Sequence, residues 1–143
     1  MKKQGKRFKT HNFNTSPLIA LTAEEHLMII NPTHVSLLAF MENRATATDW
    51  YNVTFRIHMA MTAAKLAGYT DETVAQLREV HDMLLQVERE SFEVGHKSWL
   101  MTAEEVQLLN AGIEASDQIQ YSSKRLFIHK AAVSSKKVMA QYV

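Results

Sequence analysis

Seven histidines give this chain its most evident capacity for chemistry, because a neutral imidazole is the commonest protein ligand for a metal ion. A zinc-binding helix presents two histidines four residues apart, so that both rings lie on one face. No two histidines of the sequence have that spacing, and the nearest pair, His26 and His34, lies on either side of Pro32. The spacing therefore predicts no metal site.

Two pairs of neighbouring glutamates could supply an acid and a base, but a structural role accounts for each pair. Glu25 lies three residues after Thr22, and Glu105 lies three residues after Thr102. This spacing is typical of a capping box at the start of a helix. We interpret both pairs as first-turn acids of two helices.

The sequence also lacks the residues that characterise other kinds of active site. The chain has no cysteine, which excludes thiol catalysis and thiolate metal sites, and its serines lack the flanking glycines of a nucleophile elbow. Four glycines are scattered along the chain, so that no glycine-rich loop can hold a phosphate. We therefore predict no catalytic residue, no cofactor and no enzymatic activity, and we expect the protein to act by binding.

Charge is strongly segregated along the sequence, although the net charge is only +1. All 15 acidic residues lie between Glu24 and Asp117, whereas each end of the chain carries five basic residues and no acid. The basic residues of the two ends are Lys2, Lys3, Lys6, Arg7 and Lys9, and then Lys124, Arg125, Lys130, Lys136 and Lys137.

These basic ends predict a contact surface for nucleic acid or for another anionic partner. Near the C-terminus the basic residues alternate with apolar ones such as Phe127, Val133 and Tyr142, so that one helical face could present the charges to phosphates. Alternatively, this helix packs on the acidic middle of the chain, or its charges favour its own dipole. Its apolar side chains also suit packing within the bundle or a homodimer contact.

The segment 71–94 is the clearest amphipathic helix of the sequence, with apolar residues such as Val74, Leu77 and Val80 recurring every three or four positions. Its polar face predicts a second contact surface, for a basic partner, although an ordinary solvated exterior has the same pattern. The acidic residues that we assign to this surface are Glu79, Asp82, Glu88 and Glu90.

Apolar periodicity predicts an all-α fold, an antiparallel bundle of about four to six helices. The alternation from Val53 to Met61 would also fit a strand, but the run of strong helix formers after it favours a helix. Two apolar stripes place this helix at the centre of the bundle. The expected helices are residues 23–30, 32–42, 49–67 and 71–94, with Pro32 ending the first, and a long region from residue 103 that breaks near Ser122-Ser123 or Ser134-Ser135.

Domain organisation follows from composition. Residues 1–16 are polar, basic and aperiodic and predict a flexible arm, and residues 17–143 are expected to form one helical domain.

No apolar run approaches the length of about 18 residues that spans a membrane. Polar residues, and not the apolar segment of a signal peptide, follow the basic start. We therefore expect a cytoplasmic protein without a membrane partner.

The stretch from Thr48 through Met61 to Gly68, with the amphipathic helix after it, resembles small uncharacterised helical proteins of proteobacterial phages and plasmids. The resemblance covers residues 21–120 and rests on overall character, so that it carries no catalytic residues. It implies an accessory protein of a mobile genetic element, and such proteins often inhibit host defence, as anti-CRISPR proteins do.

We therefore expect a non-enzymatic binding protein that modulates a host protein or ribonucleoprotein. The alternative is a nucleic-acid-binding regulator that uses the basic arm and the C-terminal helix. Either function is compatible with a homodimer.

Overall fold

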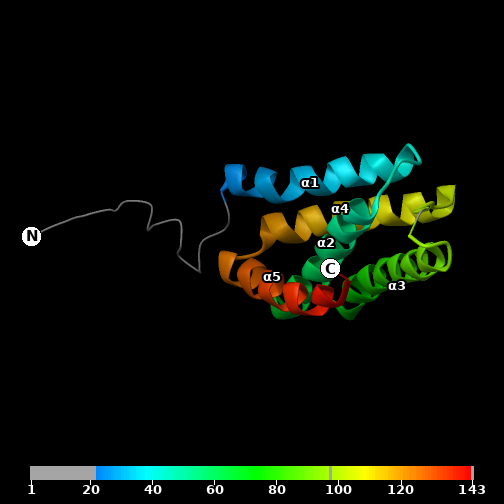
Figure 1. Cartoon of the computed structure of the whole chain (residues 1–143). Coiled ribbons are helices and arrows are strands. Elements are labelled where there is room, and N and C mark those ends of the chain that lie inside the picture. The colour runs from blue at the N-terminus through cyan, green and yellow to red at the C-terminus, as the bar shows by residue number, and fades with distance from the viewer. Residues whose placement is uncertain (1–21, 97, 143) are drawn as a thin grey trace, which may run out of the picture.

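The computed structural model describes residues 22–96 and 98–142, which fold into a bundle of α-helices (Figure 1). No strand occurs in these residues, and the predicted all-α fold is confirmed. The predicted arm lies outside the described residues, so that its five basic residues stay a prediction. The elements are α1 (Ala23–Met41), α2 (Ala47–Leu66), α3 (Asp71–Glu93), α4 (Ala103–Ser122), α5 (Arg125–Met139) and the 3₁₀-helix η2 (Ala140–Tyr142).

The helix α2 lies at the centre of the bundle and packs against each of the other four α-helices. Ten of its 20 residues are buried, including Val53, Ile57 and Ala63. Segment 53–61 is therefore helical, and the strand alternative is wrong. The apolar residues alternate there because the helix is covered on more than one side, not because the backbone is extended.

Side-chain contacts show that α3 runs antiparallel to α2. The rings of His58 and His81 lie 5.5 Å apart, and the indole N–H of Trp50 donates to the backbone carbonyl of Leu84 at 2.8 Å. The lower residue number on α2 therefore meets the higher residue number on α3, as antiparallel helices require. Gly68, with a φ of 80°, closes α2 in the left-handed conformation that the tight connection requires.

The helix α1 passes through Pro32 without a break, so the expectation of two separate helices there was wrong. Residues on both sides of the proline, such as His26 and Phe40, are buried, and one continuous helix keeps both of its halves packed on the bundle, where α1 contacts α2 and α4. The proline ring itself is exposed. The hydroxyl of Thr33 donates to the carbonyl of Ile29 at 3.4 Å, which adds a contact where the proline ring disturbs the regular backbone ladder.

The long C-terminal helical region breaks at Ser123, one of the two expected places. Ser123 is buried in an extended conformation, and its hydroxyl donates to the carbonyl of Ile119. The other candidate, Ser134-Ser135, lies inside α5, which turns back along α2. This turn brings the first residues of α5 close to the first residues of α1.

In residues 22–96 and 98–142, none of the helices has the length and the apolar character needed to cross a membrane.

Candidate functional site

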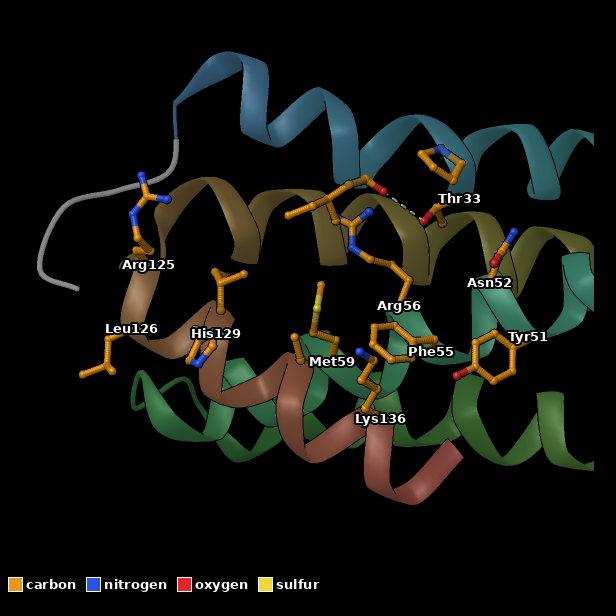
Figure 2. A pocket seen from close by; sticks show the side chains of 14 residues that line it. Thr33, Tyr51, Asn52, Phe55, Arg56, Met59, Arg125, Leu126, His129 and Lys136 are labelled. Atoms are coloured by element: carbon orange, nitrogen blue, oxygen red, sulfur yellow. Dashed lines mark hydrogen bonds between the residues drawn. The ribbon is translucent and has the colours of Figure 1, made fainter. Parts of the chain in front are cut away.

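A groove of about 810 Å³ lies between α1 and α5, with α2 behind it (Figure 2). We call it the α1–α5 groove. Its lining is mainly apolar, and its volume is within the range of about 300–1,000 Å³ that is usual for ligand sites. The main apolar side chains are Ile29 and Pro32 of α1, Phe55 and Met59 of α2, and Leu126 and Ile128 of α5.

Arg56 lines this groove and is 2% exposed. Its Nη2 donates to Oδ1 of Asp117 on α4 at 2.8 Å, and the second carboxylate oxygen of Asp117 lies 2.8 Å from Nε2 of His34. Burial lowers the pKa of Arg56, although the nearby Asp117 carboxylate counteracts that shift. An arginine keeps its charge in spite of such a shift. The groove therefore has a buried positive charge in its lining.

A second arginine lies at one end of the groove. Arg125 is half-buried, and its Nη2 donates to Oε1 of Glu25 at 2.7 Å while Nη1 donates to the other oxygen. Together with the backbone N–H of Thr22, this arginine lowers the pKa of Glu25 to about 2. The ion pair fixes the first turn of α5 to the first turn of α1.

Exposed basic side chains of α5 border the rest of the groove. His129 and Lys136 both line it and are exposed. Among the described residues that line the groove, none is acidic. The groove is therefore apolar along its walls, and its lining carries the positive charges of Lys136 and of two arginines, Arg56 and Arg125, that are each paired with a carboxylate.

The side of α1 that faces away from the bundle carries five exposed apolar side chains around the exposed Asn31, and we call it the outer face of α1. It joins the groove at Pro32, which is exposed and also lines the groove. On a helix, these positions fall within one side. The exposed large side chains of the outer face are Leu27, Met28, Val35, Leu38 and Met41, with exposed fractions from 45% to 72%.

Two histidines meet in the interior, on the opposite side of α2 from α1. His58 Nδ1 lies 2.7 Å from the hydroxyl of Ser135, and burial lowers the pKa of His58 and of His81. Ser135 is fully buried, so that this serine and histidine pair is closed to a substrate in this structure. Within the part of the chain that the structure describes, no three His, Asp or Glu side chains are grouped to hold a metal ion.

The predicted basic residues of the C-terminal segment do not share one environment. Lys124, Lys130, Lys136 and Lys137 are exposed, whereas Arg125 is half-buried in its ion pair with Glu25. The helix α5 packs mainly on α2, and the four lysines remain exposed and available to a partner.

Three of the four acidic residues that were assigned to a contact surface of α3 lie on one side of this helix. Glu79, Asp82 and Glu90 are exposed along one side of α3. Glu88 is half-buried on the other side, with its Oε2 3.5 Å from Nε2 of His96. Glu88 therefore does not belong to the same surface.

The sequence prediction missed the groove and its central arginine. Arg56 is the one lysine or arginine inside the apolar segment 50–64, and this isolated charge was a signal in the sequence. A long charged side chain is rarely buried unless it has a partner, so its place among core residues marks it for attention. The groove itself needs α5 to turn back beside α1, which no local pattern indicates.

Comparison with known proteins supplies no relative, since no family model, no curated protein and no solved structure matches the chain.

Proposed function

We propose that the protein is a binding protein that engages a partner protein through the outer face of α1. The observation that carries this proposal is that α1 is apolar on both sides, while the bundle covers only one of them. A helix that is apolar all round is normally buried all round, and a contiguous exposed apolar patch usually marks an interaction site. In the mobile element that the resemblance implies, the partner would be a host protein or ribonucleoprotein.

The charges at the ends of the outer face favour a partner other than a second copy. Glu24 is at the start of α1 and Glu42 is its C-cap, and α1 contains no lysine or arginine. In a symmetric contact between two copies of α1, glutamates would face glutamates in either helix direction. We therefore expect the partner to present an apolar surface flanked by basic groups.

Co-purification from a proteobacterial host tests this proposal. We expect a defined partner to co-elute with the wild-type protein in a fixed ratio, and the Val35→Glu variant to lose it. The matched control is Val133→Glu, which adds the same charge at an exposed valine of α5 and should retain the partner. Equal retention by both variants would contradict the proposal, and a mass of twice the chain by light scattering would identify a homodimer instead.

The exposed lysines of α5 support a second candidate function, the binding of nucleic acid. Four lysines of the predicted set are exposed, and the sequence of α5 contains no acid. A mobility-shift series in rising salt checks this directly, because phosphate contacts release counterions and weaken as salt increases. We expect Lys130→Gln with Lys137→Gln to reduce both the affinity and its dependence on salt. Absence of binding at low salt would exclude this candidate.

A further inference from the structure

The guanidinium of Arg56 has more hydrogen-bonding capacity than the chain uses. Nη2 is paired with Asp117, but Nε and Nη1 have no hydrogen-bond partner among the described residues, and both atoms are buried. Buried polar groups in folded proteins nearly always have a partner, and a charged donor without one needs an explanation. Because Arg56 lines the α1–α5 groove (Figure 2), a ligand in this groove is a candidate hydrogen-bond acceptor for it.

A ligand in this groove would meet two kinds of surface. The walls, which include Phe55, Met59 and Leu126, suit a flexible apolar chain. The positive charges of Arg56 and Lys136 suit an anion, the described lining contains no acid, and the carboxylate of Asp117 behind the lining is already paired with Nη2 of Arg56. A single molecule with an apolar chain and an anionic head satisfies both.

The depth of Arg56 favours a carboxylate as the head group. At 2% exposure its guanidinium is reached only from within an apolar space, so the anion must lose its hydration to reach it. A carboxylate carries one charge, whereas a phosphate monoester carries up to two near neutral pH and loses more hydration. A carboxylate oxygen accepts the remaining N–H groups of an arginine in short, charge-assisted hydrogen bonds.

We propose that the α1–α5 groove binds a single-chain amphipathic carboxylate, with its head group on Nε or Nη1 of Arg56 and its apolar chain along Phe55, Met59 and Leu126. Lys136 at the border of the groove attracts the anion as it approaches. This site does not depend on the partner proposed for the outer face of α1, since the two surfaces meet only at Pro32.

Calorimetric titration of the full chain with sodium dodecanoate, below its micelle concentration, tests the site. We expect one molecule to bind, and we expect dodecylammonium, with the same chain and the opposite charge, to bind at least about tenfold more weakly, as the loss of a charged hydrogen bond requires. No binding of dodecanoate, or equal binding of both probes, would overturn the proposal.

Two variants of α5 separate the groove from the surface around it. Ala132 lines the groove, and Ala132→Phe should fill it and abolish binding of dodecanoate, while Val133→Phe, at an exposed position of the same helix outside the lining, should leave binding unchanged. Circular dichroism establishes that each variant is folded. Unchanged binding by a folded Ala132→Phe would show that dodecanoate binds elsewhere.

A second readout tests the contact with Arg56 in the wild-type protein. It requires no variant of this buried residue and does not depend on whether such a variant folds. In dodecanoate labelled with ¹³C at the carboxyl carbon, the chemical shift reports protonation of the bound head group. A head group on Arg56 should bind as the ionised carboxylate at neutral pH, because charged hydrogen bonds from the guanidinium oppose the effects of burial and of Asp117 on its pKa. A head group that is protonated when bound at neutral pH would mean burial without the arginine and would refute the assignment.

Discussion

The helices α1 and α2 are nearly equal in length, at 19 and 20 residues, and both carry apolar residues on more than one side. The chain covers α2 with four other helices, whereas α1 packs mainly on α2 and α4. Two helices with similar apolar sequences are therefore covered to different extents by the rest of the bundle. The difference teaches that packing within the described residues does not explain the exposed apolar residues on the outer face of α1, and we propose that a bound partner covers them.

Truncation of one residue in each helix should give the largest contrast. Ile57 is fully buried in α2, and Ile57→Ala should lower the free energy of unfolding by about 3 kcal/mol, because it leaves a cavity. Val35 is 62% exposed on α1, and Val35→Ala should change it by less than about 0.5 kcal/mol. Urea unfolding measures both, and similar losses would mean that the outer face of α1 is part of the core.

The close packing around α2 predicts a smaller effect at Gly112, the one glycine that lies inside a helix in residues 22–96 and 98–142. A Cβ at Gly112 would lie 2.9 Å from Cγ2 of Val80 and 3.1 Å from Cδ1 of Ile57. Alanine gains about 1 kcal/mol in helix propensity, but overpacking costs about 1–3 kcal/mol, so Gly112→Ala should destabilise the protein by about 1 kcal/mol. Val80→Ala should relieve the clash, so that the double variant is more stable than the two separate losses imply. Strict additivity would argue against tight packing there.

The ion pair that joins α1 to α5 should give the smallest effect, and one that depends on pH. Arg125→Gln should lower the free energy of unfolding by about 0.5 kcal/mol near neutral pH, since the pair is partly exposed. The folded protein holds the pKa of Glu25 at about 2, against 4.5 ordinarily. This stabilisation is present above pH 4.5 and is lost as the pH falls towards 2.

Unfolding in urea across this pH range checks the sign. The variant should lose much of the dependence on pH that Glu25 contributes, and what remains comes from the backbone N–H of Thr22, which the variant leaves in place. The control is Lys130→Gln, which removes an exposed charge of the same helix and should keep the wild-type profile. If both variants keep that profile, the ion pair does not hold α5 to α1.

Much of the fold could be predicted from the sequence because its signals are local. The capping boxes at Thr22 and Thr102 begin α1 and α4 where they were expected, and Gly68 ends α2. Pro32 misled the prediction because burial of both halves of α1 in the bundle outweighs the loss of one backbone donor. The candidate site was harder to predict, because the groove depends on where α5 turns back along α2, and the environment of Arg56 depends on the approach of Asp117 from α4.

The central claim is that the outer face of α1 is covered by a partner in the cell, and site-specific photo-crosslinking tests it most directly. A photoreactive residue is placed at Val35 on α1 or at Val133 on α5, both of which are exposed. The account predicts a discrete crosslinked product with another protein from position 35, and none from position 133. The absence of a product from position 35, or the same product from both positions, would contradict it.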